Sequence, residues 1–243
     1  MRNLKLTIEY NGTNFYGWQS QPDKPTIQKT IEAALEKILN HKVSLIGAGR
    51  TDGGVHALGQ IANFTTTNFI LPSKLLKGLN SLLPMDIVVK SIQEVDKNFH
   101  SQYHAKSRVY EYHVWNHPIH SVFFHSFCWH IRKKLPLDPM KEAVKFILGK
   151  HNFASFQAAG CDRNPVREVL QCSFKINNPR IIFSIEADGF LRHMVRNIMG
   201  TFFDVGKGKL KVSDFKQILE EKDRTKAGIT APAKGLSLKE IKY

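Results

Sequence analysis

Hydrophobic and polar residues follow one another along this chain in two rhythms. Alternation with a period of two predicts half-buried strands, whereas apolar residues spaced three or four apart predict amphipathic helices. By this criterion we expect strands at 4–10, 43–48, 60–65, 87–95, 108–115, 169–176 and 181–187. We expect helices at 27–39, 73–82, 139–148, 190–205 and 212–220. Thr26 and Asp138 precede two of these helices and are the predicted N-caps.

Strands and helices are mixed over the whole length, and several neighbouring strands are close enough to form hairpins. This order is typical of an α+β protein built on largely antiparallel sheets. The pattern begins a second cycle after about residue 105, so we predict two halves, 1–105 and 106–243. A duplicated, ferredoxin-like arrangement fits the element order, although periodicity alone does not give the order of strands in a sheet.

Charge is distributed unevenly between the two halves. The chain has 35 Lys and Arg residues against 21 Asp and Glu, a formal net charge of +14. Residues 106–243 hold 24 basic and 13 acidic side chains, whereas residues 1–105 have a net charge of only +3. Such an excess favours a polyanionic partner, nucleic acid first, and the plainer alternative is a generally basic protein.

Other features narrow the class of protein. No apolar run approaches the roughly 18 residues that a membrane helix needs, and the N-terminus begins as a strand rather than a signal peptide. The three cysteines, Cys128, Cys161 and Cys172, form no C-x-x-C pair, so we expect a reducing, cytoplasmic setting without membrane association. Phosphate-binding glycine loops and the nucleophile elbow of α/β-hydrolases are absent from the sequence.

Five histidines lie within one stretch, and a metal site is the obvious question. The residues are His113, His117, His120, His125 and His130. Zinc usually needs convergent ligands with cysteine or carboxylate help, and only Cys128 lies nearby. We therefore predict no metal and interpret these histidines as loop residues, which also disfavours a metal-dependent nuclease.

The sequence GRTDGGVH, residues 49–56, joins two predicted strands. Asp-Gly favours a tight turn, because glycine adopts the positive φ that such turns need. Asp52 can thus be a simple turn residue or a reactive carboxylate that the turn presents, and these eight residues do not distinguish the two.

Aromatic and basic residues are interleaved in three further segments, which are YNGTNFYGWQSQP (10–22), SRVYEYHVW (107–115) and FLRHMVRN (190–197). Tyr110 and Tyr112 share a strand face with Arg108, and Arg192 and Arg196 share one face of the predicted helix. Stacking aromatics beside cations suit RNA recognition. For each segment alone, buried tyrosines and solvated arginines are the more ordinary interpretation.

Taken together and in order, these segments resemble the motifs of the TruA family of tRNA pseudouridine synthases. The matching stretches run from about residue 4 to residue 238: YNGTNFYGWQSQ, GRTDGGVHALGQ, NSLLP, FHSQYHAKSRVYEY, HNFASF, FLRHMVRNIMG and GLSL. The resemblance implies the pseudouridine synthase fold, with two ferredoxin-like α/β halves whose antiparallel sheets join across a central cleft. It also implies a homodimer that binds tRNA and needs no metal or organic cofactor.

The resemblance also implies an activity and a set of site residues. Members of the family isomerise uridine to pseudouridine in the anticodon stem-loop, at nucleotides 38, 39 and 40. Asp52 matches the catalytic aspartate, and Arg50, Tyr110 and Arg192 match the arginines and tyrosine that accompany it. The residues expected to bind substrate are Arg50, His56, Tyr110, Arg192 and Arg196.

Two positions depart from the family pattern. Gly53 stands where alanine is common, and Ser237 follows Gly-Leu where an aromatic residue is common. Neither change removes a reactive group. A pseudouridine synthase with another RNA specificity and a non-catalytic RNA-binding module remain the alternatives.

Overall fold

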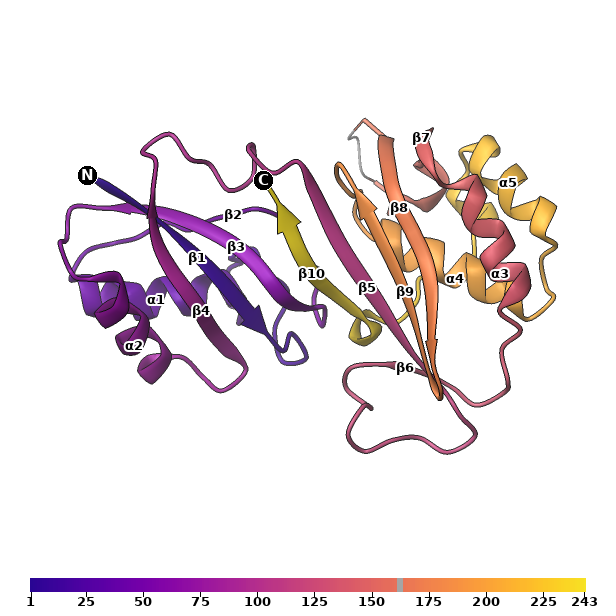
Figure 1. Cartoon of the computed structure of the whole chain (residues 1–243), viewed down its shortest axis with the longest axis horizontal. Coiled ribbons are helices and arrows are strands. Elements are labelled where there is room, and N and C mark those ends of the chain that lie inside the picture. Colours follow the sequence, from indigo (N-terminus) through magenta and orange to yellow (C-terminus); the bar gives the residue numbers. More distant parts are fainter. Residues whose placement is uncertain (161–163) are drawn as a thin grey trace. The chain divides into compact units, whose positions relative to one another are not determined.

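The computed structural model describes residues 1–160 and 164–243, so Cys161 lies outside the described residues. The chain divides into two compact units (Figure 1). Unit 1 comprises Met1–Lys106 and Ser237–Tyr243, and unit 2 comprises Ser107–Leu236. The predicted C-terminal half, 106–243, therefore differs from unit 2 at Lys106 and at Ser237–Tyr243, because the C-terminal strand pairs within unit 1.

Unit 1 is built on a mostly antiparallel sheet with the strand order β4-β1-β3-β10. Its strands are β1 (Arg2–Tyr10), β2 (Ile46–Gly47), β3 (His56–Thr66), β4 (Ile87–Val95) and β10 (Leu236–Lys242). β1 runs antiparallel to both β3 and β4, and short β2 pairs antiparallel with β3. β10 runs parallel to β3, which no periodicity in the sequence indicates.

Two helices complete unit 1, and both occur where apolar spacing predicts them. They are α1 (Ile27–Leu39) and α2 (Pro72–Leu82). The stripe Ile27, Ile31 and Leu35 is fully buried, and each such side chain contributes roughly 1.5–3 kcal/mol. Thr26 does precede α1, but its hydroxyl caps no helical N–H; its Oγ1 is buried and is the one such side-chain atom without a hydrogen-bond partner among the described residues.

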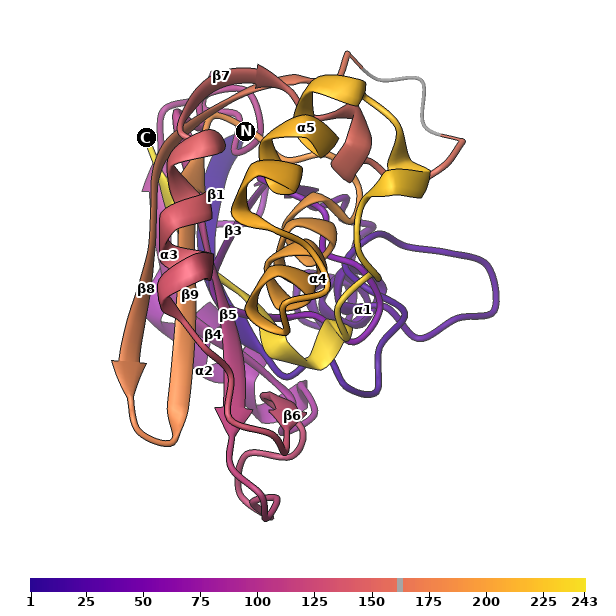
Figure 2. The same cartoon turned by 90° about the vertical axis from the view of Figure 1, so that its right-hand side faces the viewer.

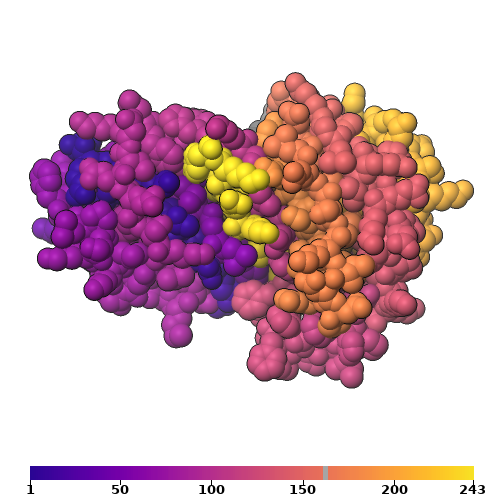
Figure 3. Space-filling model, viewed as in Figure 1, coloured from indigo at the N-terminus to yellow at the C-terminus, as the bar shows by residue number. Residues whose placement is uncertain are grey.

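Unit 2 contains an antiparallel sheet with the order β5-β9-β8-β7. Its strands are β5 (Ser107–Asn116), β6 (Trp129–Ile131), β7 (Gly149–Asn152), β8 (Val166–Asn177) and β9 (Arg180–Ala187), with β6 parallel to β5. Helices α4 (Met194–Gly206) and α5 (Val212–Glu221) lie beside one face of these strands (Figure 2). β8 and β9 are visible over much of unit 2 in the space-filling view, so no helix covers these two strands on that side (Figure 3).

The helix predicted at 139–148 is shorter in the structure. Helix α3 (Asp138–Ala143) gives way to a 3-10 turn, η1 (Val144–Phe146), instead of continuing to residue 148. Asp138 is the first residue of that helix rather than its cap, which is Leu137. The remaining 3-10 turns are η2 (Ala154–Phe156), η3 (Arg224–Lys226) and η4 (Ala233–Gly235).

The predicted helix 190–205 starts too early, because α4 begins only at Met194. His193 adopts the left-handed conformation, with φ 64° and ψ 0°, and a right-handed helix cannot pass through such a residue. In unit 1 the predicted strand 43–48 reduces to Ile46–Gly47. No helix in the described part of the chain is long and apolar enough to cross a membrane.

Candidate active site

Asp52 lies in a tight turn that leads from β2 into β3. The backbone N–H of Val55 donates to the carbonyl oxygen of Asp52 at 3.2 Å, and Gly54 has a φ of 76°. A positive φ at the third position of a four-residue turn favours glycine, so the predicted turn is confirmed. The Asp52 side chain is half-buried, and the exposed Arg50 lies two residues before it. A carboxylate and a guanidinium group thus occur within three residues of the chain.

A second loop packs directly against this turn. The N–H of Gly54 donates to the carbonyl of Phe15 at 3.2 Å, and the N–H of Trp18 donates to that of Thr51 at 3.1 Å. A Cβ on Gly17 would lie 2.5 Å from the carbonyl oxygen of Thr51, a distance that real Cβ atoms do not show. The glycine is therefore needed here, because it lets the two backbones approach closely enough to exchange hydrogen bonds.

Buried polar side chains hold the base of the turn. The Tyr10 hydroxyl and Oγ1 of Thr51 are 2.7 Å apart, and Nε2 of Gln60 donates to the carbonyl of Gly49 at 2.8 Å. Burial raises the pKa of Tyr10, so its hydroxyl stays protonated and can donate. Because Tyr10 and Trp18 are 3% and 1% exposed, these two rings belong to the core and do not form a stacking surface.

His56, a predicted substrate-binding residue, has a structural contact. Its side chain is buried, and its Nδ1 accepts a hydrogen bond from the N–H of Gly12 at 3.1 Å. The imidazole thereby connects the first residue of β3 to the loop that packs against Asp52. A role toward substrate stays a prediction.

Ser237, one of the two departures from the family pattern, lies next to His56. The parallel pairing of β10 with β3 places Ser237 opposite His56 and Leu238 opposite Ala57. Ser237 is itself buried. The C-terminal GLSL segment therefore adjoins the strand that follows the Asp52 turn, although 180 residues of sequence separate them.

The other candidate residues lie in unit 2. Tyr110, on β5, is buried and packs edge-on against Phe190, with ring centroids 5.1 Å apart. Tyr112 is fully buried, and its hydroxyl donates to the carbonyl of Pro232 at 2.8 Å. Arg108 donates from Nη1 to the carbonyl of Asp188 at 2.7 Å. Both tyrosines are thus buried and packed within unit 2, which agrees with the more ordinary of the two interpretations of this strand.

Arg192 and Arg196 do not share a helix face as predicted. Arg192 is exposed and precedes α4, because His193 interrupts the helical conformation between them. Arg196 lies within α4, and its Nε donates to the carbonyl of Ala231 at 2.8 Å. Arg50, Asp52 and His56 therefore lie in or directly beside one turn of unit 1, whereas Tyr110, Arg192 and Arg196 are residues of unit 2.

The clustered histidines do not form a metal centre in the part of the chain that the structure describes, where no group of three or more metal-binding side chains converges. His117, His125 and His130 instead contact backbone carbonyls of their own loop. Cys128 and Cys172 are free thiols. The described residues thus offer no set of ligands that fits zinc.

Sequence reasoning missed the residues that hold the Asp52 turn in place. Tyr10 and Thr51 were not among the candidate site residues, although their hydroxyls contact each other beneath the turn. The available signal was the strand alternation that places Tyr10 on the buried face of β1. Contacts between residues 41 positions apart have no local sequence signature.

Comparison with known proteins gives a consistent result over the whole chain. A family model described as tRNA pseudouridine synthase matches residues 6–104 and 143–243. "tRNA pseudouridine synthase A" of Acetivibrio thermocellus and that of Thermoanaerobacter sp. (strain X514) are each 44% identical over 244 aligned residues, covering 100% of both chains. The Buchnera aphidicola protein of the same name is 42% identical and is covered over 92% of its length.

Among solved structures, a chain of a Cbf5-Nop10-Gar1 complex matches 82% of this chain and 54% of its own length. Its TM-score of 0.35 and 15% identity mark a likeness too distant to bear on function. The relatives cover the whole chain at more than 40% identity, and the family model matches all of it except residues 1–5 and 105–142. The chain belongs to the tRNA pseudouridine synthase family.

Proposed function

We propose that this chain isomerises uridine to pseudouridine in the anticodon stem-loop of tRNA, at nucleotides 38, 39 and 40, with Asp52 as the catalytic carboxylate. As a member of the family, the chain is an isomerase. The observation that carries the assignment of Asp52 is the construction of its turn. Gly54 has the positive φ that the turn needs, and Gly17 lets the neighbouring loop approach it closely. Buried side chains hold the base of the turn, so the backbone that carries the half-buried carboxylate is fixed.

The reaction explains why one carboxylate suffices. The bond from C1′ of the ribose to N1 of uracil breaks, the base turns, and a bond forms from C1′ to C5. The C5 proton is lost and N1 is protonated, so atoms and electrons balance without an oxidant. A carboxylate can attack or stabilise the oxocarbenium-like C1′. Uracil leaves as a delocalised anion, so the second carboxylate that glycosidases use to protonate a leaving oxygen is not required.

We assign the arginines to charge and orientation. A guanidinium beside a carboxylate favours its ionised form and fixes its geometry through paired hydrogen bonds. Arg50 lies two residues from Asp52, and both Arg50 and Arg192 are exposed. Arg196 and His56 are further substrate-binding candidates, although each already has a hydrogen-bond partner in its own unit.

Tyr110 has two possible roles. Its ring can pack on a base that has left the helical stack, or its hydroxyl can serve as a general base. Its burial and its edge-on contact with Phe190 support a fixed ring position, which suits either role.

The charge of unit 2 supports tRNA as the substrate. Ser107–Leu236 holds 21 basic and 12 acidic residues, and unit 1 holds 14 and 9. Phosphate contacts from lysine and arginine supply most of the non-specific affinity for nucleic acid.

We also propose a cytoplasmic homodimer, because the resemblance to the family implies one. Light scattering of the purified protein measures its mass, and the mass of a monomer would contradict the dimer.

The test is Asp52→Asn with Gly53→Ala as the matched control in the same turn. Each protein is incubated in excess with unmodified tRNA, and pseudouridine is mapped chemically at every position. We expect Asp52→Asn to bind tRNA but form no product, and the control to resemble the unchanged protein. Near-normal conversion by Asp52→Asn would overturn the assignment, and product at other positions would indicate another specificity. If the unchanged protein binds RNA without forming product, it is a binding module.

A further inference from the structure

Tyr16 is the exposed aromatic residue beside the Asp52 turn. Its side chain is 52% exposed, whereas Tyr10 and Trp18 of the same segment are buried. Its Cα would lie 3.6 Å from a Cβ built on Gly53, the residue that follows Asp52. Tyr16 therefore lies in direct contact with the turn that carries the candidate catalytic carboxylate.

The backbone of Tyr16 is fixed on both sides. Its N–H donates to the carbonyl of Pro25 at 2.9 Å, and its carbonyl accepts from Nε2 of Gln21 at 2.8 Å. These bonds anchor the base of a side chain whose ring projects into solvent. An aromatic ring anchored in this way loses little conformational freedom when a ligand stacks on it.

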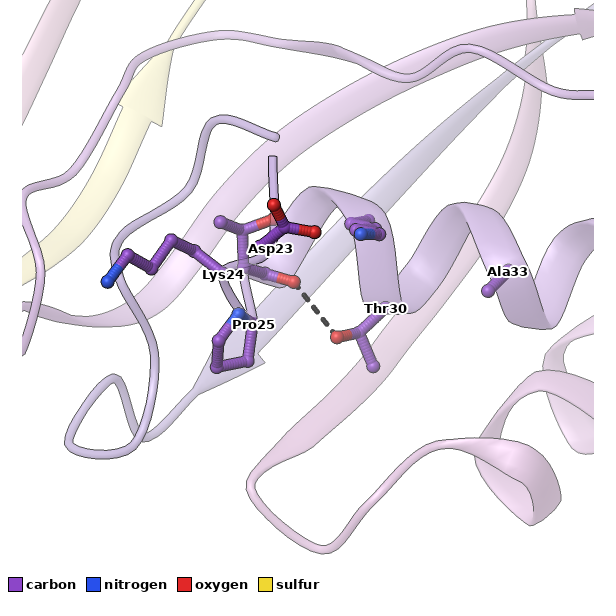
Figure 4. Close-up of a pocket in the computed structure, with 7 residues that line it drawn as sticks. Asp23, Lys24, Pro25, Thr30 and Ala33 are labelled. Carbon is purple, nitrogen blue, oxygen red and sulfur yellow. Dashed lines mark hydrogen bonds between the residues drawn. The ribbon is translucent and has the colours of Figure 1, made fainter. Parts of the chain in front are cut away.

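Lys24 provides a positive charge at this ring. Its Nζ lies 4.4 Å from the ring centroid of Tyr16, which is within the range of a cation–π contact. In Figure 4 the Lys24 side chain extends away from Thr30 and Ala33, which line the adjoining pocket. The ring remains half exposed although Lys24 lies over it, so part of its surface is open to a ligand.

The pocket itself, of about 410 Å³, is lined by Asp23 and Lys24 and by the first turns of α1 as far as Ala33 (Figure 4). Lys29 also lines it, so two lysines and one aspartate lie around it. The start of α1 is not an open anion site. The N–H groups of Ile27 and Gln28 donate to the carbonyls of Gly17 and Trp18. Positive charge at this place therefore comes from the lysine side chains.

An aromatic face beside an ammonium group matches one nucleotide, because the base can stack on the ring and the phosphate can meet the cation. A cation–π contact at an exposed site is weak, so the contact between Lys24 and Tyr16 contributes little to folding. An enzyme that extracts a uridine from its stack also leaves the neighbouring base without a stacking partner.

We propose that Tyr16 and Lys24 form a subsite for the nucleotide next to the target uridine. Tyr16 stacks on the base of that nucleotide, and Lys24 contacts its phosphate. This inference rests on the proposed function, because it takes Asp52 as the place where the target uridine reacts. The subsite would hold the unstacked flanking nucleotide while the target base occupies the catalytic centre.

The experiment compares Tyr16→Ala, Tyr16→Phe and Lys24→Gln in single-turnover reactions with unmodified tRNA. We expect Tyr16→Ala to weaken binding or slow conversion by roughly 5- to 100-fold, and Tyr16→Phe to stay within about twofold of the unchanged protein. Lys24→Gln should reduce the slope of log K against log[salt] by about 0.7, the value for one contact to a single strand. Tyr103→Ala, which removes a 77% exposed tyrosine elsewhere in unit 1, is the control and should have no effect.

A fluorescence measurement separates stacking from a general loss of fold. An anticodon stem-loop carries 2-aminopurine next to the uridine that mapping shows to be modified, and binding is followed with Asp52→Asn so that no product forms. We expect the fluorescence change on binding to disappear when Tyr16→Ala is added. An unchanged signal, or equal effects of Tyr16→Ala and Tyr103→Ala, overturns the subsite. Absence of any pseudouridine with the unchanged protein contradicts the proposed function instead.

Discussion

The N–H of Gly12 donates a hydrogen bond to Nδ1 of His56 at 3.1 Å, within the interior of unit 1. Gly12 follows β1 and His56 begins β3, so the bond joins the two segments that surround Asp52. A Cβ on Gly12 would lie 2.0 Å from the carbonyl oxygen of Val55, so no side chain fits at this position. Gly12 thus supplies a donor where no side chain fits, and His56 supplies the acceptor for it below the turn.

This bond predicts a specific ranking of variants at His56. His56→Ala leaves a buried N–H without an acceptor and opens a cavity, which we expect to lower the unfolding free energy by roughly 2–4 kcal/mol. In His56→Asn the side-chain oxygen can take the place of Nδ1, so the loss should be clearly smaller. Urea denaturation measures both values. Equal stability of the two variants would show that the acceptor is not what His56 supplies.

Gly53 offers the opposite case, a glycine that the structure does not need. A Cβ there would meet its nearest neighbour at 3.6 Å, an ordinary contact, and its φ is not in the left-handed region. Gly53→Ala should therefore raise the unfolding free energy by about 0.4–1 kcal/mol, because alanine restricts the unfolded chain. Gly17→Ala is the control, with a φ of 89° and a clash with Thr51, and should destabilise by roughly 1–3 kcal/mol. The pair is compared by thermal denaturation, and a loss of stability in Gly53→Ala would contradict this geometry.

The sequence predicted best those elements whose signal is local. Helix α1 has its apolar residues at regular helical spacing, and strand β4 alternates, and both occur at the predicted positions. The turn at Asp52 was also predictable, because the preference of glycine for positive φ is a property of the residue itself.

The failures have a common cause in contacts that are distant in sequence. β10 pairs with β3 although about 180 residues of sequence lie between them, and no feature of GLSLKEIKY predicts a parallel partner. The left-handed His193 delays the start of α4. Histidine adopts this conformation more often than most residues, but still rarely, so the sequence alone does not predict it here. In the site, the motif singled out His56, but its role as a buried acceptor depends on a loop 44 residues earlier.

Alkaline pH provides a test of the packing in unit 2. Burial raises the pKa of the Cys128 thiol from its ordinary value near 9 to about 11. Between these values the folded protein retains a proton that the unfolded chain has lost, so stability falls as pH rises. We expect a decrease of at most about 2 kcal/mol from this residue between pH 8.5 and 11. Urea denaturation across this range should show a shallower decline in Cys128→Ala than in the unchanged protein. Parallel declines would mean that Cys128 does not contribute.

The two arginines around His193 should separate catalysis from stability. Arg192 is exposed before α4, so Arg192→Ala should change the melting temperature by less than about 2 °C. If Arg192 stabilises charge in the reaction, the same change should slow single-turnover conversion by roughly 100-fold or more.

Arg196 donates to the carbonyl of Ala231, and Arg196→Ala should lower the unfolding free energy by roughly 1–3 kcal/mol, which corresponds to several degrees of melting temperature. Arg196→Lys keeps the charge but cannot reproduce the Nε contact, so it should restore phosphate binding better than stability. A fall in the melting temperature of Arg192→Ala that matches its loss of activity would assign Arg192 a structural role and remove it from the proposed catalytic set.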